Sequence, residues 1–285
     1  MGKNKLSERQ FGFREGRSTV NAIKFVREWV ETETAEGEGV LAVSLDISNA
    51  FNSIPWRWIM RAMEETFGLP TYLVEIIRKY LEGRTLEWRD SAGAVRSKRL
   101  RRGVPQGSVL GPLLWNLAYD RVLRTSLPPR CTMVCYVDDT LVLAVGEDWE
   151  DALATANLAT ARTVKAIMAM GLRVAAHKTE AMYFYKASTG GPPQNTITVD
   201  GEEIEIERSI KYLGLHLDPQ CSFLPHFRKL IPKADRMACA LARLLPNLGG
   251  PGAAVRRVYA AVTHSVLLYG APVWAEEMGR HSCAV

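Results

Sequence analysis

Two adjacent aspartates, Asp138 and Asp139, lie between two short apolar stretches, and this arrangement limits how the chain can fold. Residues 131–137 and 140–145 are rich in apolar and β-branched side chains, which is typical of strands. Two such strands on either side of a short polar pair predict a β-hairpin with both acids at its reversal. We therefore expect at least one of the two carboxylates to be held at the edge of a sheet.

A third aspartate follows another apolar segment. Residues 40–45 predict a short, almost wholly apolar strand that runs directly into Asp46. If this strand neighbours the hairpin, Asp46 and Asp138 converge, and a hard divalent cation such as Mg²⁺ would relieve their repulsion. Two such ions about 3.5–4 Å apart assist the in-line displacement of a phosphoryl group. The plainer alternative is a polar turn and a strand-end cap, and the acids alone leave both interpretations open.

A turn rich in glycine and proline spans residues 102–112 and leads into an apolar helix. Ser108 is a candidate N-cap for that helix, and Gly107 lets another backbone or a base approach closely. The Gly-Lys-Ser/Thr of a phosphate-binding P-loop is absent. Taken alone, this stretch is equally well explained as a structural turn.

The remaining pattern predicts a mixed α/β region followed by helices, which indicates a sheet domain with a helical appendage. Capping residues, prolines and apolar periodicity predict helices at 18–34, 55–66, 70–81, 108–124, 149–170, 232–245 and 251–269. Strands are expected at 85–90 and 94–101, forming a hairpin, and near 180–185, 196–199, 203–206 and 210–217.

Composition excludes some classes of protein. The 285 residues can bury a large core, and no apolar run reaches the ~18–20 residues that span a bilayer. Secretion and membrane insertion therefore gain no support. Five cysteines without a C-x-x-C pair are expected to be reduced core thiols of an intracellular protein. The net charge of +5 is by itself a weak hint of nucleic-acid binding.

The position of the charge is more informative than its total. Residues 84–102 hold seven basic residues against Glu87 and Asp90, and residues 225–270 hold seven against Asp235 alone. Part of the second group lies near one stripe of a predicted helix: Lys229, Lys233, Arg236 and Arg243. Such a stripe suits contact with a phosphate backbone, although an ordinary solvated face is the alternative.

Taken together, three segments resemble motifs A, B and C of reverse transcriptases, most closely those of non-LTR retrotransposons. They are Leu-Asp-Ile-Ser-Asn-Ala-Phe-Asn at 45–52, the glycine-rich stretch 103–112, and Tyr-Val-Asp-Asp at 136–139. The similarity extends outward in the family's order, with 10–19 resembling a fingers motif, 171–180 motif D, Tyr-Leu-Gly at 212–214 the primer grip, and 269–274 the region after the thumb.

The resemblance implies an α+β right-hand polymerase fold. The expected parts are partial fingers at 1–37, a palm with an antiparallel sheet at 38–218, a fingers hairpin inserted near 84–102, and a helical thumb with a following segment at 219–285. The implied activity is RNA-directed DNA synthesis, in which a primer 3′-OH attacks a dNTP, in the service of target-primed retrotransposition. The implied partners are an RNA template, a DNA primer or target, and dNTPs, with no membrane; the oligomeric state stays open.

The resemblance also implies roles for residues near the acids. Asp46 and Asp138 would bind two Mg²⁺ ions, or Mn²⁺ in their place, with Asp139 as a weaker participant and the Ile47 carbonyl as a further ligand. Lys178 would protonate or neutralise the pyrophosphate leaving group; a solvated surface lysine is the alternative.

Residues implied to bind the nucleotide and the primer lie in the other motifs. Phe51 would lie under the incoming sugar and exclude a 2′-OH, unless it is simply a core residue. Gln106 would lie beside the templating pair, Gly107 would admit the template strand, and Arg14 would meet the triphosphate unless it is a solvated loop arginine. The expected primer grip is Tyr212, Leu213 and Gly214.

Two departures from the family pattern are visible. Asn52 stands where many relatives carry Asp, which we expect to change local hydrogen bonds rather than to abolish activity. The chain begins about ten residues before the fingers motif, so we expect a fragment or a truncated copy. The alternatives are a catalytically inactive remnant that only binds nucleic acid, and a maturase-like or domesticated reverse transcriptase.

Overall fold

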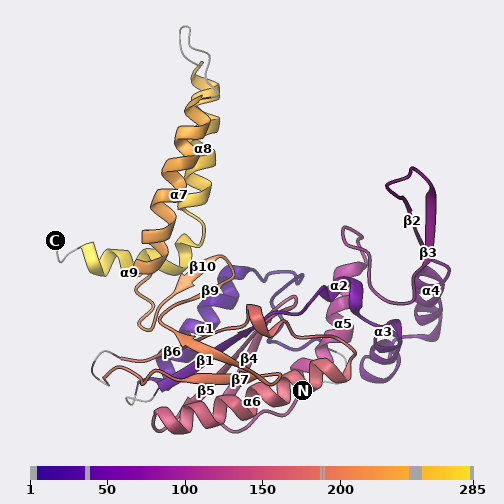
Figure 1. Cartoon of the computed structure of the whole chain (residues 1–285), viewed down its shortest axis with the longest axis horizontal. Coiled ribbons are helices and arrows are strands. Elements are labelled where there is room, and N and C mark those ends of the chain that lie inside the picture. Colours follow the sequence, from indigo (N-terminus) through magenta and orange to yellow (C-terminus); the bar gives the residue numbers. More distant parts are fainter. Residues whose placement is uncertain (1–4, 36–38, 187, 189, 244–251, 283–285) are drawn as a thin grey trace.

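A six-stranded sheet with the order β4-β5-β1-β6-β8-β7 forms the centre of this computed structural model (Figure 1). The structure describes residues 5–35, 39–186, 188, 190–243 and 252–282. The strands are β1 (Gly39–Leu45), β4 (Cys131–Tyr136), β5 (Asp139–Gly146), β6 (Glu180–Phe184), β7 (Thr196–Val199) and β8 (Glu202–Glu207). β1 pairs antiparallel with both β5 and β6, whereas β6 and β8 run parallel.

Both faces of the central strands are covered, which explains why their sequences are apolar without alternation. Val40 and Ala42 point into a cluster with α1 (Thr19–Glu33), whereas Leu41 and Val43 point into a second cluster with α5 and α6. Helix α5 spans Gly111–Leu123 and α6 spans Trp149–Ala169. The sheet is thus the middle layer of the molecule.

The chain between β1 and α5 forms a separate group of short elements beside the sheet (Figure 1). They are α2 (Ala50–Ser53), α3 (Trp56–Arg61), the π-helical turn η1 (Ala62–Thr66), α4 (Thr71–Leu81), and the hairpin of β2 (Thr85–Arg89) and β3 (Val95–Arg99). Every residue of β2 and β3 is exposed, and the hairpin extends away from the sheet.

The C-terminal part projects from the opposite end of the molecule (Figure 1). After the 3₁₀ turn η2 (Ala176–Lys178) and the sheet come β9 (Ile210–Tyr212), β10 (Leu215–Leu217), α7 (Leu224–Arg243), α8 (Ala253–Leu267) and α9 (Ala271–Ser282). Helices α7 and α8 pack on each other. Arg27 of α1 ties α9 to the sheet domain by donating to the Val273 carbonyl at 3.1 Å and by pairing with Glu277.

The predicted elements are confirmed except at several boundaries. The helix expected at 232–245 begins at Leu224, because Asp218 and Ser222 accept the backbone N–H groups that precede α7, and the exposed Pro232 lies inside it. Residues 244 and 245 lie outside the described residues. Ser108 is not the N-cap of α5, which is Leu110, although its hydroxyl accepts from Gly111 N–H at 3.0 Å.

Two further expected elements are divided. The strand expected at 210–217 is split into β9 and β10 at Leu213 and Gly214, which both have positive φ. The helix expected at 55–66 is α3 followed by the π turn η1, and α2 precedes it. A turn thus interrupts the expected strand, whereas the expected helix continues without a break but changes to π-helical hydrogen bonding at Ala62.

The chemistry of the thiols agrees with the sequence. The four cysteines within the described residues are free, as predicted, and Cys135 and Cys221 lie in the core. Cys239, however, is exposed on α7, so its predicted place in the core is wrong, and Cys283 lies outside the described residues. Among the helices that the structure describes, none has both the length and the apolar character needed to cross a membrane.

The end of β5 packs closely against the start of α6, so a methyl group added at Gly146 should destabilise the protein. A Cβ at Gly146 would lie 2.0 Å from Ala152 N and 2.4 Å from Ala152 Cα. Gly146→Ala should therefore lower the free energy of unfolding by about 1–3 kcal/mol, measured by urea denaturation. The matched Gly191→Ala, which meets no atom within 4 Å, should change it by less than about 0.5 kcal/mol. Equal effects of the two substitutions would contradict this packing.

Candidate active site

The pairing of β1 with β5 brings the three aspartates to one edge of the sheet. Leu45 lies opposite Thr140 in this ladder, so Asp46 directly after Leu45 meets Asp139 directly before Thr140. The strand that leads into Asp46 therefore does lie next to the hairpin, as expected. Its neighbour in the hairpin is β5 rather than β4. Residues far apart in sequence thus place their carboxylates close together.

The hairpin reverses one residue earlier than the sequence predicts. Asp139 is the first residue of β5 and pairs with Tyr136, so Val137 and Asp138 form the reversal. Val137 has a φ of +66°, in the left-handed region that β-branched residues rarely adopt. The two acids therefore differ: Asp138 belongs to the turn and Asp139 to the strand.

The charge of Asp46 disfavours the charges of Asp138 and Asp139. Burial, together with the charge of Asp46, raises the pKa of Asp138. Partial burial, and then the charges of Asp138 and Asp46, raise the pKa of Asp139 to about 6, although this side chain keeps an exposed surface. Within the described residues, however, no group of three or more Asp, Glu, His or Cys side chains is already arranged around a metal position. The carboxylates are thus close enough to affect one another's charge, but their oxygens are not gathered around one common metal position.

Lys178 is the cation beside these acids. Its Nζ lies 3.1 Å from Asp46 Oδ2, a buried oxygen that accepts no well-aligned hydrogen bond from the described residues. The segment before Lys178 is fixed to the same strand, because Ala175 N–H donates to the Asp46 carbonyl at 2.8 Å. The Lys178 side chain is 60% exposed, so it is held near Asp46 without being buried.

This set of residues fits a divalent cation. Carboxylate oxygens are the ligands that Mg²⁺ prefers, and a cation would relieve the repulsion described above. The buried Asp46 Oδ2 has Lys178 Nζ at 3.1 Å but no aligned donor, so it could accept a metal ion as a further partner. Asp46, Asp138 and Asp139 could hold the ion, and Ile47 follows Asp46 as a buried residue bridged to Val174.

Phe51 lies on an aromatic stack. Its ring is 5.3 Å from that of Trp115 at an interplanar angle of 14°, and Trp115 stacks in turn on Tyr119 at 5.1 Å. The exposed Phe13 touches Phe51 edge-on. Phe51 is therefore packed from one side and only half-buried, which agrees with either role expected from the sequence.

The glycine-rich turn is attached to the same segment as Phe51. Val104 N–H donates to the Phe51 carbonyl at 2.7 Å, and Gly103 N–H donates to the Ile54 carbonyl at 2.7 Å. Gln106 and Gly107 follow in an exposed turn. The structure thus brings these two residues near the Phe51 segment, while both stay at the surface.

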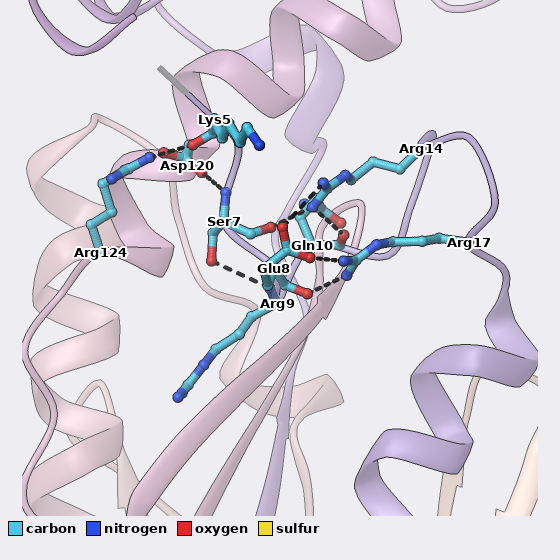
Figure 2. Close-up of polar contacts among 9 residues, drawn as sticks. All are labelled: Lys5, Ser7, Glu8, Arg9, Gln10, Arg14, Arg17, Asp120 and Arg124. Atoms are coloured by element: carbon cyan, nitrogen blue, oxygen red, sulfur yellow. Dashed lines mark hydrogen bonds and ion pairs between the residues drawn. The ribbon is translucent and has the colours of Figure 1, made fainter. Parts of the chain in front are cut away.

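Arg14 has partners that the sequence did not predict. Its Nη1 donates to the Ser7 carbonyl at 2.6 Å and to the Gln10 carbonyl at 3.3 Å, and its Nη2 lies 3.8 Å from Glu8 (Figure 2). The side chain is only 19% exposed. The guanidinium is therefore neither solvated nor free, and it holds the backbone of the segment before it.

The expected primer grip forms the tight β9–β10 hairpin. Tyr212 is 1% exposed, and burial raises its pKa well above the ordinary value, with smaller contributions from Cys135 and Asp139. Tyr269 covers the turn by donating to the Leu213 carbonyl at 2.9 Å, and a Cβ at Gly214 would clash with its ring. The hairpin therefore lies next to the acidic edge, and Tyr269 is a contact that the sequence gave no reason to expect.

The basic stripe lies on the outer face of α7. Its four members are exposed: Lys229, Lys233, Arg236 and Arg243. The buried face of the helix carries His226, Leu230 and Ala234. The charged and the buried residues of α7 thus lie on different faces, and the consequence for binding stays a prediction.

Comparisons with known proteins show which family this chain is similar to. A family model described as reverse transcriptase (RNA-dependent DNA polymerase) matches residues 1–217. The chain is 30% identical over 270 residues to a putative 115 kDa protein of the type-1 retrotransposable element R1DM of Drosophila melanogaster, which covers 93% of the chain and 25% of that protein. A Pol polyprotein of element R1 of Bradysia coprophila is 29% identical over 279 residues, with 94% and 26% covered.

A solved structure shows the same fold. Apo telomerase of Candida tropicalis, truncated from its C-terminal domain, aligns with a TM-score of 0.52 at 12% identity, covering 75% of this chain and 39% of that one. At this identity the likeness concerns the fold alone, and it confirms the predicted right-hand polymerase architecture. The chain spans about a quarter of the length of the curated relatives described above.

Repulsion among the acids predicts that removing one charge stabilises the protein without ligands. In the folded chain the pKa of Asp139 is about 6, against an ordinary value of 3.8, so its charge costs stability above pH 6. Asp139→Asn should therefore raise the melting temperature at pH 7.5, and the gain should shrink towards pH 5, where the folded wild type takes up the proton. The control Asp200→Asn, in an exposed turn with a φ of +52°, should leave the melting temperature unchanged at both pH values. A lower melting temperature for Asp139→Asn at pH 7.5 would contradict the repulsion.

Proposed function

The chain belongs to the reverse transcriptase (RNA-dependent DNA polymerase) family, and from this we propose that it carries the polymerase centre of an RNA-directed DNA polymerase. The observation that supports this proposal most is the meeting of Asp46, Asp138 and Asp139 at the edge of β1 and β5. These are the acids of the family's motifs A and C. Because the chain spans about a quarter of its relatives, the activity of the whole protein is part of the proposal.

Reverse transcriptases generally use divalent metal ions, and we propose two Mg²⁺ ions for this chain, with Mn²⁺ as a substitute. When bound, such ions stabilise the charge on the attacking and leaving oxygens of a nucleotidyl transfer. Asp46 and Asp138 would hold them, Asp139 would contribute more weakly, and the Ile47 carbonyl could add a ligand. The mutual repulsion of the carboxylates favours this assignment.

The chain's own side chains would orient the substrates and neutralise charge. Lys178, beside Asp46, would donate a proton to the leaving pyrophosphate or neutralise its negative charge. Phe51 would support the incoming sugar from its aromatic stack and exclude a 2′-OH. Gln106 and Gly107 would lie along the templating base. A contact of Arg14 with the triphosphate would require it to leave its backbone partners.

The partners follow from the same proposal. An RNA template, a DNA primer and dNTPs would meet at the acidic edge, next to the β9–β10 hairpin formed by Tyr212, Leu213 and Gly214. The stripe of Lys229, Lys233, Arg236 and Arg243 on α7 would follow the phosphates of the duplex without reading bases. Since the reported relatives belong to R1 elements, target-primed copying of element RNA is the proposed setting.

Primer extension on an RNA template tests the polymerase directly. The wild-type chain with Mg²⁺ should add dNTPs to a DNA primer, and Asp138→Asn should reduce the rate at least about a hundredfold by removing a metal ligand. Duplex binding, followed by fluorescence anisotropy against salt, should stay nearly unchanged in this variant. Asp200→Asn is the matched control and should extend like the wild type.

Two results would decide against this assignment. A wild-type chain that binds the duplex but adds no nucleotide would support a binding-only remnant instead. Full extension by Asp138→Asn would show that this carboxylate is not a metal ligand.

Sugar selection tests the role of Phe51. Because a smaller side chain leaves room for a 2′-OH, Phe51→Val should increase incorporation of rNTP relative to dNTP on the order of tenfold or more. Competition between the two nucleotides in single-turnover extension measures this ratio. Phe227→Val, a half-buried phenylalanine at the base of α7, should leave the ratio unchanged. An unchanged ratio in Phe51→Val would leave Phe51 as a packing residue.

A further inference from the structure

The turn that carries Asp138 contains a residue in an unfavourable backbone conformation. Val137 has a φ of +66°, and its two Cβ branches make this region costly for it. Such a conformation persists only where the surroundings impose it, and it occurs most often at functional sites. The question is therefore what holds Val137 in place.

One side chain bonds both polar backbone groups of Val137. Gln10 Nε2 donates to the Val137 carbonyl at 3.1 Å, and Gln10 Oε1 accepts from Val137 N–H at 2.9 Å. The two residues are 127 positions apart, so this contact is tertiary. Trp115, which stacks under Phe51, also donates its Nε1 to the Val137 carbonyl at 3.1 Å.

The backbone around Gln10 is fixed to the strand that leads into the turn. Phe11 N–H donates to the Cys135 carbonyl at 2.8 Å, and Cys135 N–H donates to the Arg9 carbonyl at 2.9 Å. Gln10 itself is 1% exposed. Its amide therefore starts from a fixed position in the core and has little freedom to turn away from Val137.

Gly12 allows this close approach. A Cβ at Gly12 would lie 2.4 Å from Val137 Cγ2 and 2.5 Å from Val137 N. Gly12 N–H also donates to Gln10 Oε1 at 3.0 Å, and Asn116 donates to the Gly12 carbonyl at 2.9 Å. The segment can thus lie directly against the turn.

A second layer of contacts holds the segment from outside, as Figure 2 shows. Arg14 reaches back to the carbonyls of Ser7 and Gln10, and the buried carboxylate of Asp120 accepts from Ser7 N–H at 2.6 Å. Arg17 pairs with Glu8 on the same segment. The unexpected partners of Arg14 are explained by this arrangement, because they fix the backbone of Gln10.

We propose that Gln10 is a positioning residue of the polymerase centre: its side-chain amide holds Val137 in the left-handed conformation and so directs the carboxylate of Asp138 towards Asp46. This inference rests on the proposed function, because it assigns the turn a role in metal binding. The acids repel one another, and a free turn would move Asp138 away from Asp46. The amide of Gln10 opposes that movement through two hydrogen bonds to buried backbone groups.

A different role would be purely structural, with Gln10 serving only to anchor the N-terminal segment. The two roles predict different measurements. Loss of an anchor lowers stability but leaves the affinity of the folded protein for metal ions unchanged. Loss of a positioning contact weakens metal binding and chemistry while nucleotide and duplex binding persist.

The test replaces Gln10 by methionine, which has a similar length but makes neither hydrogen bond. In Gln10→Met, kcat for primer extension should fall, and the Mg²⁺ concentration for half-maximal activity should rise, each by about tenfold. The KM for dNTP and the duplex affinity should stay within about twofold. Asn157→Leu is the matched control, because its amide also bridges two backbone groups, the Leu153 carbonyl at 3.1 Å and Thr198 N–H at 3.0 Å. It should change none of these quantities.

Amide hydrogen exchange without metal or substrate gives a second, independent measurement. The Val137 amide should be strongly protected in the wild type although it lies in a turn, and Gln10→Met should exchange it at least about tenfold faster, whereas Asn157→Leu should not. Because the wild-type measurement needs no variant, rapid exchange there would refute the Gln10 contact even if Gln10→Met does not fold.

The possible failures are distinguishable. Rapid exchange of Val137 in the wild type, or an unchanged Mg²⁺ requirement in a folded Gln10→Met variant, would overturn the role of Gln10 and leave the polymerase intact. A wild-type chain that extends no primer would instead count against the proposed function, and exchange of Val137 would still report on the Gln10 contact.

Discussion

Mutual repulsion among three carboxylates is the constraint around which this structure is organised. Asp46, Asp138 and Asp139 lie at one edge of the sheet, where the charge of Asp46 disfavours the charges of Asp138 and Asp139, and the charge of Asp138 disfavours that of Asp139. Left to themselves, these groups would separate or take up protons. They stay together because the antiparallel ladder of β1 and β5 fixes the backbone on which Asp46 and Asp139 lie. The stability of the core therefore supports an arrangement that is unfavourable at the site.

The surrounding elements either reduce this repulsion or hold the repelling groups in place. Lys178 supplies a positive charge beside Asp46, and the residues before it bond to the same strand. Apolar clusters on both faces of the sheet make β1 and β5 rigid, since each strand is buried between helices. Gln10 and Trp115 hold the one turn residue that precedes Asp138. These contacts agree with preorganisation, in which the fold arranges ligands before an ion arrives.

Much of the fold was predictable because it depends on local patterns. Apolar runs predicted β1, β4 and β5, and Ser18 and Gly171 marked helix ends through capping. Errors occurred where side-chain contacts override the local pattern. Asp218, on a preceding segment, fixes the start of α7, so Pro232 did not mark it. The reversal at Val137 and Asp138, rather than at the two acids, depends likewise on contacts from Gln10.

The sequence by itself determined which residue types are available to the site: three aspartates after or between apolar strands, a lysine, an aromatic residue and a glycine-rich turn, in the order of a reverse transcriptase. The tertiary structure alone decided how they are held. It commits Arg14 to backbone carbonyls, stacks Phe51 on Trp115, and sets the amide of Gln10 on Val137. No periodicity encodes these contacts. Those of Phe51 and Gln10 join positions many residues apart, whose meeting depends on the packing of the whole core, and those of Arg14 depend on how its own loop folds back.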